Sequence, residues 1–136
     1  IEAYTGDYSS YLEKVKKILF TIGMYVYKNL KSNVINISKP EGGFYLFPEF
    51  INAKFVSSSE MCKDILNKTG VALLPGSDFG LDSKRMIARL SYTDFNGEVF
   101  LKNTSGSKNL DTEDLSKYAP NIVNGTSKLK EWSSKL

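Results

Sequence analysis

Of the 18 basic residues in the sequence, only two are arginines, Arg85 and Arg89. Arg89 lies in the middle of the apolar segment 86–92, whose composition is typical of a β-strand. A charged side chain within an apolar strand is costly to bury unless it meets an opposite charge. Arginine, unlike lysine, can bind a carboxylate through two parallel hydrogen bonds. The pattern therefore predicts a carboxylate-binding site in which Arg89 is the binding residue, whereas Arg85 is expected to be an exposed, solubilising charge.

Two segments rich in glycine and aromatic residues accompany this strand. The first contains Gly42, Gly43, Phe44 and Tyr45. The two glycines would let the backbone approach a ligand closely, and the two rings could line its pocket or belong to the core. The second is the PGSDFG loop at 75–80. Such a loop can hold a phosphate through backbone N–H groups, but it lacks the P-loop lysine and the Rossmann spacing, so a nucleotide role is excluded.

The composition excludes several other kinds of site. The chain has no histidine, which removes the commonest general base, the commonest metal ligand and every Ser-His or Cys-His pair. Its one cysteine, Cys62, can form neither a zinc site nor an internal disulfide, so we predict no metal and a reducing, cytoplasmic location. We expect Cys62 to be a small core residue. A net charge of +3 is too weak to indicate nucleic-acid binding, and no apolar stretch could span a membrane.

The elements that must position these residues follow from hydrophobic periodicity and from caps. Apolar residues at helical spacing predict a long helix over 8–30, whose stripe we expect to pack into the core. A capping box from Ser57 to Glu60 opens a second helix, which ends at Gly70. Four strands are predicted at 34–38, 43–47, 71–74 and 86–92, the first two as a hairpin; an extended loop at 94–109 and two short helices near 111–118 and 122–132 follow. Together they predict one α+β domain, residues 1–136, in which a small antiparallel or mixed sheet of about four strands packs against the long N-terminal helix.

The order of the motifs adds more than any one of them. The chain carries PEGGFY at 40–45, then GV at 70–71, PGSDFG at 75–80 and RLS at 89–91. This succession resembles the C-terminal small domain of the fold-type I, class I/II, pyridoxal-phosphate-dependent aminotransferases. The resemblance covers residues 8–97 and, more weakly, the tail.

The resemblance implies roles for particular residues. Arg89 would bind the α-carboxylate of an amino acid or a 2-oxo acid, and Gly42, Gly43, Phe44 and Tyr45 would line the side-chain end of that pocket. The cofactor, pyridoxal phosphate, would be bound by a large domain preceding Ile1. In the family, the lysine that carries the cofactor lies in a Ser-x-x-Lys motif on the large domain. That spacing occurs here only at 105–108 and 127–130, after the RLS segment, so neither copy lies in the family's context. We therefore expect no catalytic residue and no activity in this chain alone, and a homodimeric parent protein.

Two other classes of function stay open at this stage. Pyridoxal-phosphate lyases, synthases and some transcription regulators share this small domain. The chain could also be a free-standing regulatory module that binds an amino acid through Arg89. The first residue is not methionine, which favours a part of a larger protein over an independent module.

Overall fold

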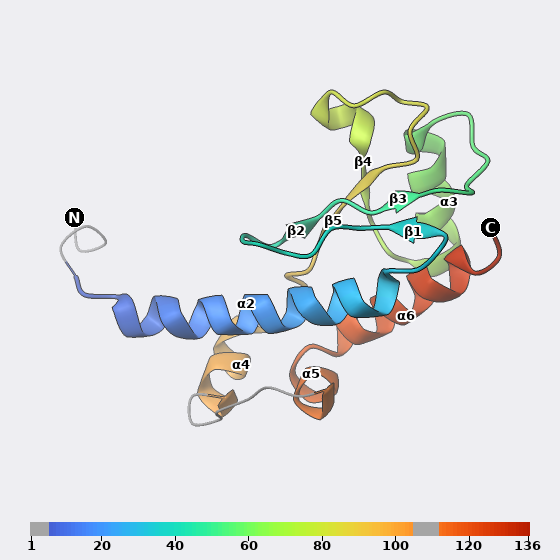
Figure 1. Cartoon of the computed structure of the whole chain (residues 1–136). Coiled ribbons are helices and arrows are strands. Elements are labelled where there is room, and N and C mark those ends of the chain that lie inside the picture. Colours follow the sequence, from blue (N-terminus) through green and yellow to red (C-terminus); the bar gives the residue numbers. More distant parts are fainter. Residues whose placement is uncertain (1–5, 105–111) are drawn as a thin grey trace.

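The computed structural model describes residues 6–104 and 112–136, and it confirms the α+β class (Figure 1). The long helix α2 runs beneath the strands, α6 lies against its C-terminal half, and α3 packs on α6 and on β4. The elements are α2 (Ser9–Leu30), β1 (Ile35–Asn36), β2 (Tyr45–Leu46), β3 (Glu49–Phe50), α3 (Ser58–Thr69), β4 (Leu74–Pro75), the 3-10 turn η1 (Gly76–Phe79), β5 (Ala88–Ser91), α4 (Gly97–Thr104), α5 (Thr112–Tyr118) and α6 (Pro120–Ser133).

The predicted bounds of the first two long helices are confirmed to within a residue. In α3 the Ser57 hydroxyl accepts the N–H of Glu60 at 3.2 Å, and the Glu60 carboxylate accepts the N–H of Val56 at 2.9 Å. Gly70 ends the helix with a φ of 73°, in the left-handed region that favours glycine. The capping box therefore fixes where α3 begins, and Gly70 fixes where it ends.

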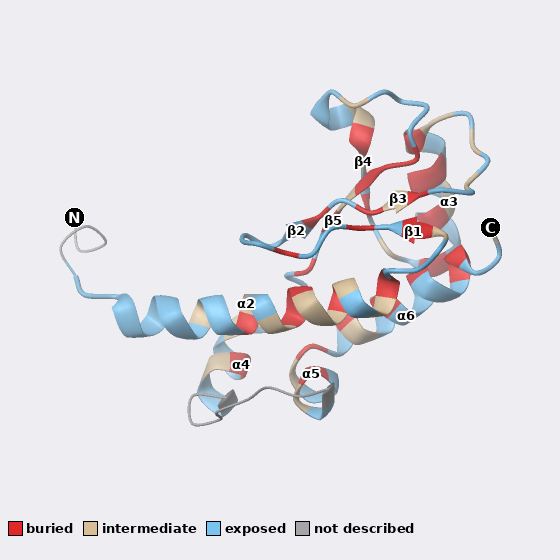
Figure 2. Cartoon of the chain, in the orientation of Figure 1, coloured by how far each residue is buried: buried red, intermediate tan, exposed pale blue. Residues whose placement is uncertain are grey.

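The apolar stripe of α2 is only half buried, which corrects the prediction that all of it packs in the core. Ile18, Ile22 and Val26 are buried, but Tyr11 and Leu12 in the first turns are about half exposed. The reason is visible in Figures 1 and 2: the N-terminal half of α2 extends beyond the strands and beyond α6. Periodicity identifies the apolar side of a helix, but not how far the rest of the fold covers it.

The strands pair differently from the predicted hairpin. β1 pairs with β3, Ile35 opposite Phe50, and β2 joins β5 and β4 in a three-stranded sheet of order β2-β5-β4. All pairs are antiparallel, and a single bridge from Glu49 to Ile87 links the two sheets. The chain thus turns back after β1, as predicted. However, β2, the strand that directly follows the turn, pairs with β5, and only the next strand, β3, pairs with β1. Such short strands leave the choice of partner to tertiary packing rather than to local sequence.

Another correction concerns the predicted loop at 94–109, because residues 97–104 form helix α4. Asn96 accepts the N–H of Val99 through its side chain at 3.1 Å and so caps the first turn. Phe100 is fully buried, with its ring 5.6 Å from that of Phe95 and 5.7 Å from that of Tyr118. Burial of Phe100, with Leu101 packed beside it against the core, holds this short helix. The rest of the predicted loop, from residue 105 onward, lies outside the described residues.

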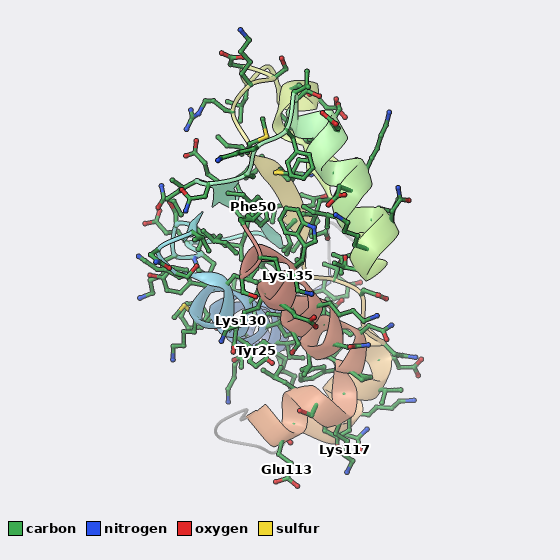
Figure 3. The ribbon with its side chains drawn as sticks, turned by 90° about the vertical axis from the view of Figure 1, so that its right-hand side faces the viewer. Tyr25, Phe50, Glu113, Lys117, Lys130 and Lys135 are labelled. Carbon is green, nitrogen blue, oxygen red and sulfur yellow. The ribbon has the colours of Figure 1, made fainter. Side chains whose placement is uncertain are left out.

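The C-terminal helices agree with prediction, and Figure 3 shows α6 with Lys130 and Lys135 labelled. Several buried side chains tie α6 to the core, among them Leu129 and Trp132. Trp132 packs edge-on against Phe50, with ring centroids 5.4 Å apart. Its indole N–H donates to Asp64 Oδ2 at 2.9 Å, and Asp64 Oδ1 pairs with Lys68 at 2.8 Å. The hydrogen bond from Lys68, and then that from Trp132, hold the pKa of Asp64 below its ordinary value.

This depressed pKa gives a prediction for the pH dependence of stability. A carboxyl with a lower pKa in the folded state stabilises the fold above its unfolded pKa, about 3.9, and loses that effect as the pH falls through the folded value. Asp64→Asn should therefore lower the free energy of unfolding by about 1 kcal/mol at pH 7 and by less at pH 3. Urea unfolding at the two pH values measures this, with Glu131→Gln, in an exposed pair with Lys135, as the control. An equal loss at both pH values would contradict the assignment.

Candidate functional site

The outer face of the three-stranded sheet is where the predicted binding residue lies. Along β5, Ala88 and Leu90 are buried against the helices, while Arg89 is half-buried on the opposite side. An exposed sheet face normally carries polar side chains. Here the surrounding side chains are large and apolar, yet each is 38–45% exposed: Tyr45, Phe47, Leu74 and Phe79. A lone cation in a partly exposed apolar face is the arrangement expected of a binding surface rather than of a solvated surface.

The guanidinium of Arg89 lies over two aromatic rings. Its Cζ is 4.3 Å from the ring centroid of Tyr45 and 4.4 Å from that of Phe79. Both distances are within the range of a favourable cation–π contact. Among the described residues no carboxylate pairs with Arg89, and no hydrogen bond of its side chain is found. Arg89 thus has two aromatic partners, and its N–H donors have no acceptor among the described residues.

The PGSDFG loop puts Phe79 in this position. Gly76 approaches β5 so closely that its N–H donates to the carbonyl of Ile87 at 2.8 Å. One 3-10 turn follows, Gly76–Phe79, and Gly80 ends it with a φ of 80°, in the left-handed region. Gly76 is therefore needed for the close approach to β5, and Gly80 for the positive φ that ends the turn. The turn between them brings Phe79 back over Arg89.

Substitution of Gly76 tests this geometry. A Cβ at this position would lie 3.0 Å from the Ile87 carbonyl oxygen and 3.1 Å from Leu81 Cδ1. Gly76→Ala should therefore push the loop away from β5 and lower the free energy of unfolding by about 1–3 kcal/mol. Gly42→Ala is the matched control, since a Cβ added there would meet nothing within 4 Å and the φ of Gly42 is not in the left-handed region. Equal stability of the two variants in chemical denaturation would show that the close approach is unimportant.

The other predicted site residues divide into two groups. Phe44 lies beside the site, with its ring 4.3 Å from that of Tyr45. Gly42 and Gly43 lie in the exposed turn before β2, where Gly43 has a φ of 69° and its carbonyl accepts the Tyr92 hydroxyl at 2.9 Å. That turn borders a groove against α2. The structure thus brings Tyr45 and Phe44 close to Arg89, whereas it places the two glycines further along the sheet.

Arg85 is exposed, as predicted, but it is also paired with a carboxylate. Arg85 forms a bidentate ion pair with Glu49: Arg85 Nε donates to Glu49 Oε1 at 3.1 Å, and Arg85 Nη2 donates to Glu49 Oε2 at 3.0 Å. The pair joins the segment before β5 to β3, next to the bridge between the two sheets. The chain's other arginine is thus already occupied by a carboxylate, which leaves Arg89 as the arginine available to a ligand.

The described residues do not fit pyridoxal phosphate. A lysine that carries this cofactor must lie in an enclosed site, but every lysine within 6–104 and 112–136 is solvent-exposed. The described residues also hold no group of His, Cys, Asp and Glu that could bind a metal ion. Cys62 is buried as predicted, and burial raises the pKa of its thiol to about 11, so it is not a nucleophile at neutral pH. No helix in the described part of the chain has the length and apolar character needed to cross a membrane.

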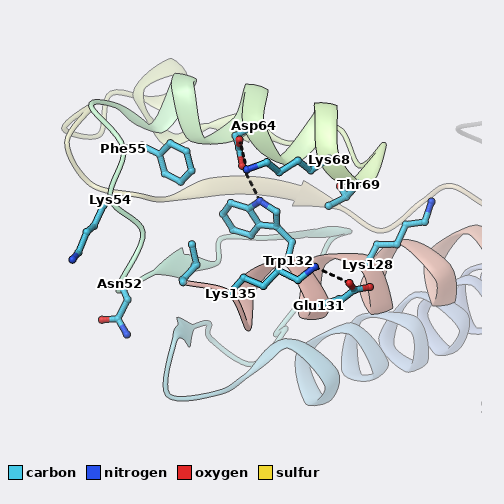
Figure 4. Close-up of a pocket in the computed structure, with 11 residues that line it drawn as sticks. Asn52, Lys54, Phe55, Asp64, Lys68, Thr69, Lys128, Glu131, Trp132 and Lys135 are labelled. Atoms are coloured by element: carbon cyan, nitrogen blue, oxygen red, sulfur yellow. Dashed lines mark hydrogen bonds and ion pairs between the residues drawn. The ribbon is translucent and has the colours of Figure 1, made fainter.

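A groove of about 790 Å³ between α3 and α6 is a second concave feature of the molecule (Figure 4). Phe55 and Trp132 form part of its wall, with their rings stacked at 6.1 Å. Its two carboxylates are already paired, Asp64 with Lys68 and Glu131 with Lys135. Lys54 and Lys128, the other lysines that line it, are exposed and point outward, so no described side chain in this groove is positioned to bind a ligand.

Known proteins resemble this chain in sequence and in fold. It is 34% identical over 97 residues to an aspartate aminotransferase of Bacillus sp. (strain YM-2), a match that covers 68% of this chain and 24% of the relative. It is 36% identical over 95 residues to a "Probable N-acetyl-LL-diaminopimelate aminotransferase" of Bacillus subtilis (strain 168), covering 68% of this chain and 23% of the relative. The chain thus spans about a quarter of the length of these relatives. No protein-family model matches it.

Two solved structures share the fold. An alanine aminotransferase from Pyrococcus furiosus superposes with a TM-score of 0.62 at 20% identity, over 93% of this chain and 25% of that one. An aspartate aminotransferase from Thermotoga maritima superposes with a TM-score of 0.53 at 22% identity, over 85% of this chain and 23% of that one. The matched region is again about a quarter of the larger protein.

Proposed function

The chain belongs to the fold-type I aminotransferase family, and we propose that it is the C-terminal small domain of a pyridoxal-phosphate-dependent aminotransferase. The parent protein would transfer an amino group between an amino acid and a 2-oxo acid. Residues 1–136 would form one domain of it, and a large, cofactor-binding domain would precede Ile1. The contribution of this domain is Arg89, which binds the α-carboxylate common to both kinds of substrate.

The observation that carries the proposal is the unpaired guanidinium of Arg89 in an apolar, partly exposed sheet face. A substrate carboxylate would complete an ion pair that nothing in the described residues provides. When the large domain covers this face, water is excluded and the pair strengthens, because charges attract more strongly at low dielectric constant. Binding would therefore favour the closed active site, and closure would orient the substrate.

The remaining parts of the proposal follow from the same placement. Phe44 and Tyr45 would line the side-chain end of the pocket. Gly42 and Gly43, in the turn further along the sheet, would shape the approach to it. Pyridoxal phosphate, once bound to the large domain, would supply the electron sink for the amino-group chemistry. The relatives are named for different substrates, so their names leave the particular amino acid open. We also propose a homodimeric parent protein in the cytoplasm.

Comparison of the isolated chain with the full-length protein tests the proposal. Each is incubated with pyridoxal phosphate and desalted, and its absorbance is recorded before and after addition of a panel of amino acids. We expect retained cofactor and amino transfer only in the full-length protein. Retained cofactor in the 136-residue chain that responds to an amino acid would overturn the assignment of the chemistry to another domain. A full-length protein that binds the cofactor but eliminates or condenses its substrate would indicate a lyase or a synthase.

A further inference from the structure

Phe79 contacts Arg89 although its residue type carries no charge or hydrogen-bonding group. Its ring lies 4.4 Å from Arg89 Cζ, nearly the distance of Tyr45 at 4.3 Å, although the two aromatic residues come from separate segments of the chain. Tyr45 is on β2, and Phe79 ends the 3-10 turn after β4. We propose that Tyr45 and Phe79 form a two-sided aromatic clamp, in which Phe79 is a positioning residue for Arg89. The identity of the ligand, a substrate carboxylate, rests on the proposed function, whereas the contacts of the two rings with Arg89 do not.

Each ring of the clamp is itself supported by a second ring. Phe47 meets Phe79 edge-on, with centroids 5.8 Å apart and planes at 89°. Phe44 lies 4.3 Å from Tyr45. A lone exposed ring samples several rotamers, whereas a ring held by a neighbour loses little further freedom when a ligand arrives. The four exposed aromatic residues around Arg89 therefore act as two supported pairs rather than as unrelated surface residues.

The clamp has a consequence for which ligands Arg89 accepts. Arginine presents its five N–H donors in the plane of the guanidinium. In the proposed clamp the two rings, each 4.3–4.4 Å from Cζ, lie above and below that plane. An oxyanion must then approach in the plane, at the edge of the guanidinium, where a planar carboxylate can accept two parallel hydrogen bonds. Leu74 pairs directly with Arg89 across the sheet, so this side of the approach is apolar and offers no competing acceptor side chain.

The chain is well suited to a direct test because it contains only two arginines. In protein labelled with ¹⁵N-arginine, side-chain NMR signals arise from Arg85 and Arg89 alone, and Arg85→Lys assigns them. Two stacked rings should shift the Arg89 side-chain protons upfield and slow rotation about its Cζ–Nη bonds. Phe79→Leu should remove much of both effects, and Phe79→Tyr, which restores a ring, should keep them. Phe20→Leu, at a phenylalanine on α2 that is 56% exposed, is the matched control and should change neither.

Binding of a carboxylate probe gives the second readout. Pyruvate is titrated while the Arg89 signals are followed, and Phe79→Leu should weaken binding about threefold to tenfold, with Phe79→Tyr close to wild type. Unchanged Arg89 shifts and rotation in Phe79→Leu would overturn the clamp, as would equal pyruvate affinity of Phe79→Leu and wild type. Dispersed backbone amide signals in every variant show that the fold is retained. The shift and rotation measurements need no substrate, so a full-length protein without aminotransferase activity would refute the proposed function and leave the clamp standing.

Discussion

Arg89→Lys in the full-length protein should lower kcat/KM for the amino donor by roughly 100-fold, which corresponds to about 3 kcal/mol. Lysine keeps the charge but loses the two parallel hydrogen bonds to the carboxylate and the stacking between Tyr45 and Phe79. We expect KM to rise because ground-state binding is weakened, and kcat to fall because a substrate held by one point charge is less well oriented. Steady-state kinetics with the best donor from the amino-acid panel provide the measurement.

Arg85→Lys is the matched control for this experiment, since it makes the same substitution at the chain's other arginine. Arg85 is paired with Glu49 and is about half exposed, so its replacement should change kcat/KM by less than about threefold and stability by less than about 1 kcal/mol. If Arg89→Lys behaves like Arg85→Lys, Arg89 does not bind the substrate carboxylate. Retained cofactor in both variants would show that neither substitution acts by unfolding the protein.

Phe50→Ala should lower the free energy of unfolding of the isolated chain by about 3–5 kcal/mol. Phe50 is 1% exposed and contacts Trp132 edge-on, and its backbone N–H donates to the Met86 carbonyl at 2.9 Å. Its ring therefore occupies the place where β3, the segment before β5 and α6 meet. Loss of the ring leaves a cavity that these elements cannot fill without moving. Because domains of this kind are stable by only about 5–15 kcal/mol, this one substitution removes a large share of the total.

The measurement is chemical denaturation followed by far-ultraviolet circular dichroism, since the fluorescence of Trp132 would also report the loss of its direct neighbour. Ile51→Ala is the control at the next position along the chain. Ile51 is 58% exposed, so its truncation should change stability by less than about 0.5 kcal/mol. A loss below about 1.5 kcal/mol in Phe50→Ala would mean that the core closes over the missing ring and that α6 is held mainly by other contacts.

Helices α2, α3, α5 and α6 were predictable because their signals are local. The capping box at Ser57 and the left-handed Gly70 mark the ends of α3 within the sequence itself. The pairing of the strands was not predictable, because two-residue strands choose partners through packing that no local pattern records. Helix α4 was missed for a related reason, since the burial of Phe100 against Tyr118 depends on residues distant in sequence.

The site divides in the same way. Arg89 could be found from its residue type and its apolar surroundings. Phe79 could not, since its position depends on a single 3-10 turn that folds back across β5. The signal was present in the PGSDFG segment, where glycines on either side of Phe79 fix the turn. The sequence indicates that the loop is a wall near the pocket, but only the geometry shows that one of its side chains covers the guanidinium.

The uncovered half of α2 implies a gradient of local stability along one continuous helix. Toward Leu30 the backbone amides can exchange with solvent hydrogen only when the whole core opens. Near Ser9 no core burial opposes local opening, and a helical segment this short is barely stable in water by its own propensity. Amide exchange should therefore be fast in the first turns of α2 and slow by orders of magnitude in the last. The first turns of α2 become as rigid as the last only when another surface covers them.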